Sequence, residues 1–328
     1  MAVTFVPHKA CRVGFGLQSA KGTAETQPSV VFPVNNGMER VWNMNHEFFQ
    51  YADGVFSGET HYFSSGRWLN VKCRFPLVPG MLQYDPALTW SKPHDDIGDI
   101  GDWMFARTAL ADYHQSLWAT IFVETGTGNG IAYPDCKVLS GEIDVSQRQL
   151  VYVDVDVCGI GAPVSWTPTA ADGTTGWATD ATTVTHDPYT FKDATVTLAG
   201  AAEASMKSLK LSFDNMVRDP GDGVVLGSLY PAYLPNGALA QWTGSFDRDF
   251  VDTVVNNAYV AGTEFALVLT LDAGTPAATF TFPRTIITEN GVPNVPDSGI
   301  VTQDGVGFKC LGAANGSARA YTIAEVIA

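Results

Sequence analysis

The side chains of this chain that could bind a metal ion are few, and none forms a recognised ligand pattern. His94-Asp95-Asp96, followed by Asp99 and Asp102, could supply imidazole and carboxylate ligands. That segment is rich in proline and glycine, where acidic side chains are usually solvated or cap the following helix. The run 219–223 begins like a calcium loop but lacks the downstream glutamate, so we interpret it as a turn. We therefore predict no metal site.

Catalytic motifs are equally absent from the sequence. It contains no nucleophile elbow, phosphate-binding Walker loop, HExxH helix or Cys–His pair. Gly14-Phe15-Gly16 lacks the third glycine of a dinucleotide-binding loop. A carboxylate pair for glycoside hydrolysis has no sequence signature, so a β-rich hydrolase stays open as an alternative. Trp166 and Trp177 would suit sugar binding or hydrophobic anchoring of a loop. We predict a protein without catalytic residues or cofactors.

Composition favours a β-rich protein with an acidic surface. Hydrophobic residues make up 45% and charged residues only 16%, with 32 glycines and 18 prolines. The formal net charge of −15 would repel nucleic acid. The five cysteines are widely spaced, which predicts buried free thiols made in a reducing cytoplasm. The chain has neither a signal-peptide pattern at its start nor a run of ~18 apolar residues, so we expect no membrane insertion by this chain.

Strand patterns recur along the chain, and helices are rare. The clearest strand alternates Val151, Val153, Val155 and Val157 with acidic and aromatic residues, a period of two. The strongest helix pattern covers 103–118, and a short helix is predicted near 248–258. We expect loops over 85–103 and 161–187. The predicted strands are 29–34, 38–49, 68–78, 118–124, 131–139, 149–158, 189–191, 194–198, 208–213, 264–271, 278–288 and 305–311.

Short matches in a preserved order indicate that one domain occurs twice. The matched pairs are Met38/Met206, Asp53/Asp222, Phe75/Phe246, Val123/Leu271, Tyr133/Phe282 and Cys158/Cys310. Their spacing changes once, between the third and fourth pairs, so we place an insertion near 84–103 in the first copy. The predicted fold is mainly β: two tandem copies of a small β-sandwich or barrel domain, each with one flanking helix. The domains are 1–160 and 188–328, joined by a linker over 161–187.

Several segments resemble the tail tube proteins of long-tailed bacteriophages. In that family a strand with a small residue followed by Cys-Lys-Val precedes a strand of alternating valines, as Cys136-Lys137-Val138 precedes Val151 here. The resemblance covers nearly the whole chain, although 85–103 and 161–187 are not clearly matched. The similar segments are 14–24, 32–34, 133–138, 141–143, 151–159, 189–196, 206–209 and 214–215.

The resemblance implies a structural virion protein, the major tail tube subunit, located in the virion tail and made in the host cytoplasm. Subunits of this family form stacked rings whose sheets join into an inner barrel through which genome DNA passes. The implied partners are other copies of the chain and the terminator, tape measure and distal tail proteins, with transient, non-sticking passage of DNA. The alternatives are a carbohydrate-binding or adhesin-like β-sandwich protein, a tail terminator and a capsid decoration protein.

Two sets of residues are candidate functional sites under this reading. The turn-rich segments 53–66 and 219–237 are predicted to contact the next ring, because each carries aromatic residues that would be costly to expose; these are Phe56, Tyr62, Phe63, Tyr230 and Tyr233. Strand carboxylates are predicted to line the channel and repel DNA; these are Glu142, Asp144, Asp154 and Asp156. The duplication predicts a ring of three chains, with six single-copy chains as the alternative.

Overall fold

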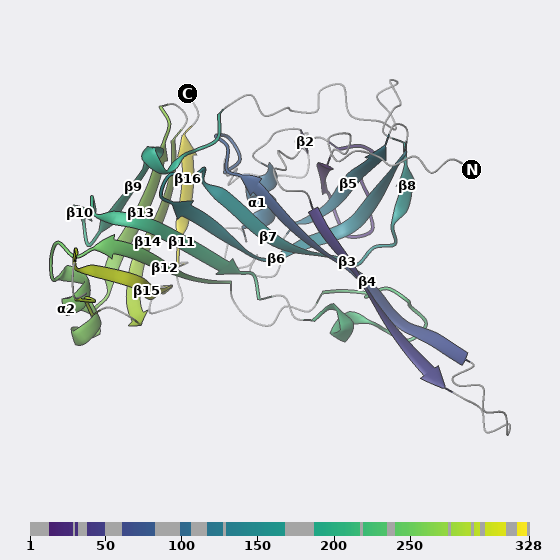
Figure 1. Ribbon diagram of the computed structural model, residues 1–328. Coiled ribbons are helices and arrows are strands. Elements are labelled where there is room, and N and C mark those ends of the chain that lie inside the picture. The colour runs from purple at the N-terminus through teal and green to yellow at the C-terminus, as the bar shows by residue number, and fades with distance from the viewer. Residues whose placement is uncertain are drawn as a thin grey trace.

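The structure is a computed structural model, and it confirms the mainly β fold class. It describes residues 13–28, 30–31, 38–49, 61–82, 99–105, 117–126, 129–167, 187–216, 219–234, 240–274, 277–289, 292–295, 299–312 and 320–326. Within these residues, sixteen strands belong to one connected sheet and two α-helices accompany them (Figure 1).

The strands of the first half are β1 (Val13–Gln18), β2 (Val30–Val31), β3 (Met38–Phe49), β4 (His61–Pro76), β5 (Trp118–Gly126), β6 (Asn129–Ser146), β7 (Tyr152–Gly159) and β8 (Val164–Trp166). Those of the second half are β9 (Ala194–Leu198), β10 (Ala201–Ala202), β11 (Met206–Asp214), β12 (Gln241–Asp249), β13 (Phe265–Asp272), β14 (Ala277–Glu289), β15 (Thr302–Cys310) and β16 (Thr322–Val326). Helix α1 (Asp99–Met104) lies between β4 and β5 in the chain, and α2 (Val254–Ala261) lies between β12 and β13.

The two halves pair their strands in the same order. The first half runs β2-β1-β5-β6-β7-β4-β3 and the second runs β10-β9-β13-β14-β15-β12-β11. In addition, β8 pairs with β6 just as β16 pairs with β14. Every pair is antiparallel, and in each half one long strand, β6 or β14, pairs with three other strands of that half. The order of elements, including the helix, is therefore the same in both halves.

Strands β6 and β11 join the halves. Residues 140–146 of β6 pair with residues 208–214 of β11, with Ile143 opposite Leu211. The amide of Asn215, just after β11, donates hydrogen bonds to the carbonyls of Met104 (3.1 Å) and Val138 (3.0 Å). These bonds tie the end of α1 in the first half to the beginning of the β11–β12 connection in the second.

A second contact fixes the chain's last strand on the first half. The Glu325 carboxylate of β16 accepts hydrogen bonds from the backbone N–H groups of Gly80 and Leu82, each at 2.8 Å, and from the Tyr189 hydroxyl at 3.1 Å. Because a carboxylate binds N–H and O–H donors strongly, this contact ties β16 of the second half to residues 80–82 of the first.

The hydrophobic core runs through both halves without interruption. Alternation places Val153, Val155 and Val157 of β7 in the core, while Asp154 and Asp156 lie on the opposite face. At the junction, the Phe105 ring lies 5.0 Å from Phe213 and 5.5 Å from Trp242, measured between ring centroids. One apolar cluster therefore contains buried residues from both halves.

The first helix begins earlier than the sequence predicts. Residues 99–103, predicted as loop, belong to α1, and the predicted helix 103–118 overlaps it only at its start. Residues 106–116 lie outside the described part, and β5 begins at Trp118. Helix α1 is set by the spacing of buried Ile100, Trp103 and Met104. Gly101 permits the close packing, since a Cβ there would lie 2.5 Å from the carbonyl oxygen of Met81.

Other strands and helices also begin or end at residues that differ from those predicted from sequence. Residues 61–66, predicted as a turn, extend β4, and residues 164–166 of the predicted linker form β8, which pairs with β6. Residues 248–249 complete β12, so the second helix begins only at Val254. In each case strand pairing continues beyond the point where alternation of residue types is recognisable.

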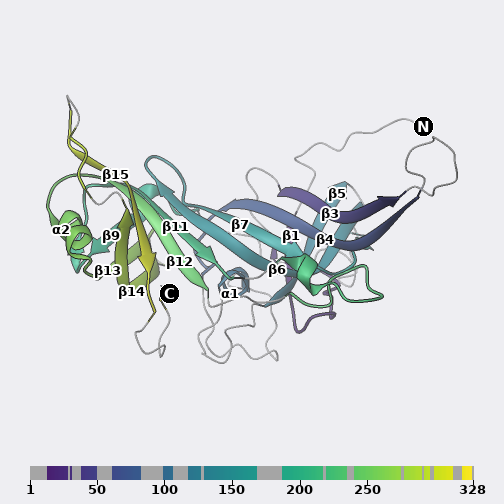
Figure 2. The same cartoon turned by 90° about the horizontal axis from the view of Figure 1, so that it is seen from below.

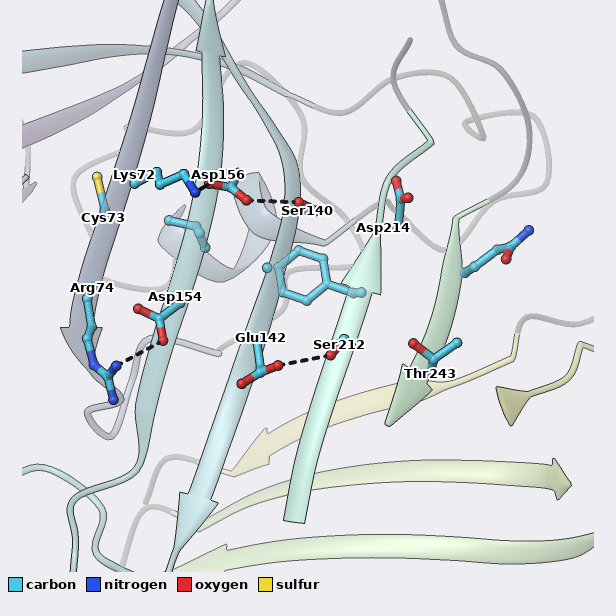
Figure 3. A pocket seen from close by; sticks show the side chains of 14 residues that line it. Lys72, Cys73, Arg74, Ser140, Glu142, Asp154, Asp156, Ser212, Asp214 and Thr243 are labelled. Carbon is cyan, nitrogen blue, oxygen red and sulfur yellow. Dashed lines mark hydrogen bonds and ion pairs between the residues drawn. The ribbon is translucent and has the colours of Figure 1, made fainter. Parts of the chain in front are cut away.

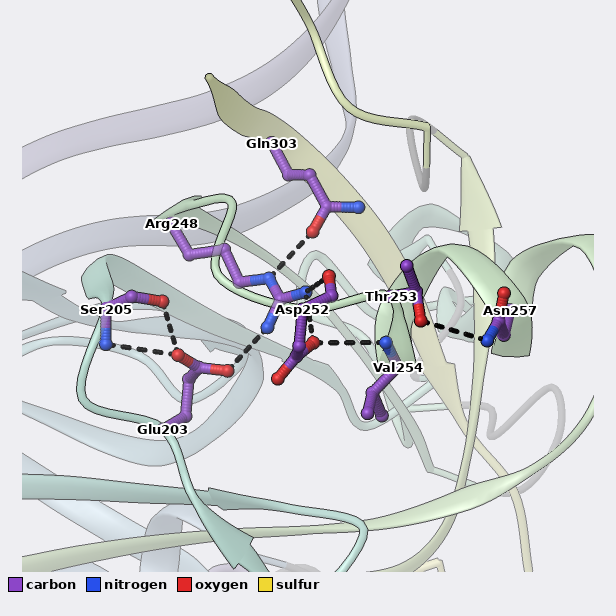
Figure 4. Close-up of polar contacts among 8 residues, drawn as sticks. All are labelled: Glu203, Ser205, Arg248, Asp252, Thr253, Val254, Asn257 and Gln303. Atoms are coloured by element: carbon purple, nitrogen blue, oxygen red, sulfur yellow. Dashed lines mark hydrogen bonds and ion pairs between the residues drawn. The ribbon is translucent and has the colours of Figure 1, made fainter. Parts of the chain in front are cut away.

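Arg248 of β12 is a buried cation that organises one end of the second half (Figure 4). Its Nη1 lies 2.5 Å from Glu203, its Nη2 3.1 Å from Asp252, and its Nε donates to Gln303 at 2.7 Å. Asp252 in turn accepts the N–H of Val254 at 3.0 Å, at the beginning of α2. The Arg248 cluster therefore connects β12, β15, the β10–β11 turn and α2.

We predict that Arg248→Ala lowers the free energy of unfolding of the unassembled subunit by roughly 3–5 kcal/mol, since it leaves the Glu203 carboxylate buried without its cation. Lys210→Ala removes an exposed ion pair with Glu142 and should cost less than about 1 kcal/mol. Denaturant unfolding of both variants measures the difference. Equal costs would mean that the Arg248 cluster does not hold this end together.

Candidate functional site

The outward face of the central strands is polar. Strands β4, β7, β6, β11 and β12 lie side by side, and the face opposite the core forms a groove of about 800 Å³ (Figure 3). The polar and charged side chains that line it are Lys72, Arg74, Ser140, Glu142, Asp154, Asp156, Ser212, Asp214, Gln241 and Thr243. The groove crosses the β6–β11 junction, so both halves contribute to it.

The four predicted channel carboxylates come together on this face, and each lies near a cation. Arg74 lies 3.5 Å from Asp154 and 4.0 Å from Asp144. Lys72 lies 3.8 Å from Asp156, and Lys210 lies 3.2 Å from Glu142. We predicted the acids from sequence but missed the cations, although the alternation of Lys72 and Arg74 with Val71 and Cys73 could have placed them on the same face.

Acidic side chains remain in excess across these five strands. The carboxylates on the face include Glu142, Asp144, Asp154, Asp156, Asp214, Asp247 and Asp249, and the cations include Lys72, Arg74, Lys137, Lys207 and Lys210. Toward β15 the same face carries Thr243 and Ser245 opposite Lys309 and Gly307, and Glu289 of β14 lies over Gly307. The acidic residues are thus concentrated on β7, β6, β11 and β12.

The charges on this face influence one another. Partial burial raises the pKa of Asp154; nearby Glu142 and Asp144 raise it further, while Arg74 lowers it. The hydrogen bond from Lys210 to Glu142 raises the pKa of Lys210. The Ser212 hydroxyl also donates to Glu142 at 3.3 Å. The cations reduce the mutual repulsion of the acids on this face.

The described thiols are unsuited to nucleophilic chemistry. Cys73, Cys136, Cys158 and Cys310 are buried and free, as expected, whereas Cys11 lies outside the described residues. Burial raises the pKa of Cys73, Cys158 and Cys310 to about 12, so the reactive thiolate is scarce at neutral pH.

Metal-binding clusters and membrane-spanning helices are absent from the described residues. Among the described residues no three His, Cys, Asp or Glu side chains gather closely enough to hold a metal ion. His94, Asp95 and Asp96 lie outside them, and Asp102 is buried in α1. None of the helices described is long and apolar enough to span a membrane.

The predicted ring-contact residues are only partly described. Phe56 lies outside the described residues, and Tyr62 and Phe63 are placed on β4 by their backbone alone. Tyr230 is partly buried and Tyr233 is 51% exposed, both in the β11–β12 connection. This connection contacts the first half: the Leu229 carbonyl accepts the Arg67 N–H at 2.7 Å, and Lys21 donates to the Ala232 carbonyl.

One of the two tryptophans that would suit sugar binding is buried in the fold. Trp166 is buried, with its ring 5.0 Å from that of Phe122. Trp177 lies outside the described residues. A tryptophan packed in this way offers no face on which a sugar ring could stack.

Comparison with known proteins identifies the family. A family model described as phage tail tube protein matches residues 52–309. The chain belongs to the phage tail tube protein family. No curated protein matches it significantly. The matched region begins between β3 and β4, ends in β15 and includes all strands of the polar groove. The tail tube family assigns the chain a structural role in the virion tail and favours a protein that is not an enzyme.

We predict that Arg74→Ala raises the pKa of Asp154 further, because Arg74 is the group that lowers it. A carboxyl group whose folded pKa is raised binds its proton more tightly when folded. Stability contributed by Asp154 is therefore lost as pH rises from the ordinary value of 3.8 through the raised pKa, and the variant extends this loss to higher pH. NMR titration of the Asp154 carboxyl measures the shift.

Lys72→Ala is the matched control for Arg74→Ala, since Lys72 pairs with Asp156 and not with Asp154. It should leave the Asp154 titration unchanged. An unchanged Asp154 pKa in Arg74→Ala would show that the two side chains do not interact in solution.

Proposed function

We propose that this tail tube protein is the major tube subunit of a long-tailed phage and that three chains close into a ring around the DNA channel. The observation that carries the proposal is the sheet itself. Two halves with the same strand order are already joined edge to edge by β6 and β11, and comparable edges remain at both ends of the chain's central sheet. The repeated strand order supports the internal duplication expected from sequence.

The internal junction provides a template for the contact between chains. Along one edge of β6, β5 pairs as far as Cys136 and β11 pairs with residues 140–146. Along the corresponding edge of β14, β13 pairs as far as Thr285, and residues 286–289 have no partner there within the described residues. Strand β3, which corresponds to β11 in the shared order, pairs only with β4 among the described strands. We infer that β14 of one chain pairs with β3 of the next, antiparallel, as β6 pairs with β11.

Repetition of this contact closes a ring. Each chain contributes eight strands to the central sheet, in the order β3-β4-β7-β6-β11-β12-β15-β14. A contact that joins the last strand of one chain to the first of the next is heterologous, and it closes when its rotation divides a full turn. If the β14–β3 contact between chains turns the sheet by the same angle as the β6–β11 contact between halves, a ring of three chains contains six similar units.

The polar face is the part of the subunit that suits the channel. Its excess of carboxylates repels the DNA backbone over about a Debye length, ~8 Å at physiological salt, so DNA can move without adhering during ejection. The acids are densest on β7, β6, β11 and β12, while the β12–β15 part carries Thr243, Ser245 and Lys309, with Glu289 beside it. In a ring of three, strongly acidic stretches therefore alternate with stretches of lower negative charge around the channel.

The remaining assembly contacts follow from the same role. The β3–β4 and β11–β12 connections contact the next ring, and the tube ends bind the tail terminator and distal tail proteins. The channel holds the tape measure protein before DNA passes. These partners rest on membership of the tail tube family.

Images and mass measurements of assembled rings test the ring proposal. We expect three chains per ring, with the face that carries Glu142, Asp144, Asp154 and Asp156 turned toward the channel. Six chains per ring would contradict the trimer but leave the tube intact. A polar face turned outward, or a neutral or basic channel wall, would contradict the channel mechanism.

We predict that Thr288→Pro prevents ring formation and leaves the subunit folded. Thr288 is exposed and lies in the irregular step between Ile287 and Glu289, outside the paired register with β15. Proline fixes φ and removes the backbone N–H of residue 288, so it disfavours strand pairing by residues 286–289. Thr288→Ala removes the same side chain but keeps the N–H, so it should assemble normally in sedimentation experiments. Normal rings from Thr288→Pro would show that this edge is not the contact.

A further inference from the structure

The β11–β12 connection presents an exposed apolar tip. Val225, Leu226 and Leu229 are 44%, 104% and 45% exposed. The base of the connection is fixed: Asp219 accepts the Gly221 N–H at 2.8 Å, the Ala232 N–H donates to the Gly223 carbonyl at 2.8 Å, and Leu234 is buried. The connection therefore has a fixed base and exposes large apolar side chains at its tip. This combination is typical of a site that binds another protein surface.

A second apolar surface lies at the opposite end of the same strand, β12. It consists of Val251, Val292, Val295 and Ile300, which are between 58% and 74% exposed. Its segments are held together by the backbone, since the Phe250 N–H donates to the Val301 carbonyl at 2.8 Å and Asn294 exchanges two hydrogen bonds with Thr302. We call these four residues the apolar end surface.

The position of α2 beside this surface is fixed from within the fold. Asp252, next to Val251, binds buried Arg248 and accepts the first N–H of α2. Figures 1 and 2 show α2 and the beginning of β15 on the side of the molecule opposite the β11–β12 connection. The apolar end surface is thus preformed in the subunit.

The two apolar features are separated by the length of one strand. Strand β12 has nine residues, which span roughly 30 Å at ~3.4 Å per residue. Because the tip precedes β12 and the surface follows it, copies stacked in the same orientation bring the tip of one copy toward the surface of the next. Such a contact joins different surfaces and propagates without closing, as a tube requires.

We propose that the apolar end surface receives the Val225–Leu226–Leu229 tip of a second copy of this chain in the adjacent ring. The inference rests on the proposed tube function and adds the surface to which the ring-contact connection binds. Burial of apolar area on both sides drives the association. In a ring of three, each interface between rings contains three such contacts, and their effects multiply.

Substitutions at either side test the stacking contact. Leu226→Asp and Ile300→Asp each place a charge in the apolar contact, and each should leave rings at normal yield while raising the protein concentration needed for tube growth at least about tenfold. Val164→Asp is the control, because Val164 on β8 is 54% exposed and belongs to neither apolar feature. Tubes of normal length from both variants would overturn the inference.

A cysteine pair tests proximity without relying on the charged variants. The double variant Leu226→Cys, Ile300→Cys should form disulfide-linked chains under mild oxidation in tubes, and neither single variant nor isolated rings of the double variant should do so. Tubes without cross-links would overturn the stacking inference but keep the proposed function. Wild-type protein that forms neither rings nor tubes would overturn the proposed function, and the inference with it.

Discussion

Strand β6 pairs with β5 along the first part of one edge and with β11 along the last part of the same edge. An exposed strand edge carries unpaired N–H and C=O groups, which must be bonded, covered or protected. For β6, in the first half, strand β11 of the second half supplies the partner. The contact also brings Phe105 of one half against Phe213 and Trp242 of the other, so edge pairing and core packing reinforce each other. The same requirement is unmet at β14 and β3 within the described residues, and this is the physical basis of the proposed contact between chains.

The period of two along each strand separates the core from the face that we propose lines the channel. Val153, Val155 and Val157 complete the core, and the intervening Asp154 and Asp156 form part of the polar groove. A row of carboxylates would repel itself as well as DNA. Lys72, Arg74 and Lys210 reduce the first repulsion, and the remaining acidic excess preserves the second. The face can therefore be acidic enough to repel a polyanion without destabilising the sheet that carries it.

The sequence was sufficient for the fold class, for most strands and for the four acids that share one face, because alternation and composition are local properties. Phe75 lies opposite Val153 and Phe246 opposite Val306, but Cys158 stands one residue before the end of β7 and packs outside the main core, whereas Cys310 ends β15 and packs in it. Other features depend on contacts between distant segments. Met38 lies opposite Cys73 but Met206 opposite Arg248, so the hairpins differ in register. The buried hydrogen bonds of Arg248 and the hydrogen bonds that Glu325 accepts likewise cannot be recognised from the neighbouring sequence.

In the proposed ring, strand edges pair between chains and must not pair prematurely, and the described edge of β14 has two features that reduce this risk. Its pairing with β15 shifts between Ile287 and Glu289, and such an irregularity twists an edge away from flat pairing. Glu289 then places an acidic side chain over Gly307, where a Cβ would lie 2.5 Å from its Cγ. Charge near an edge opposes pairing with unmatched strands. Specific assembly then depends on a partner whose shape and charge fit this edge, and the internal β6–β11 contact shows that the chain can make such a fit within a single molecule.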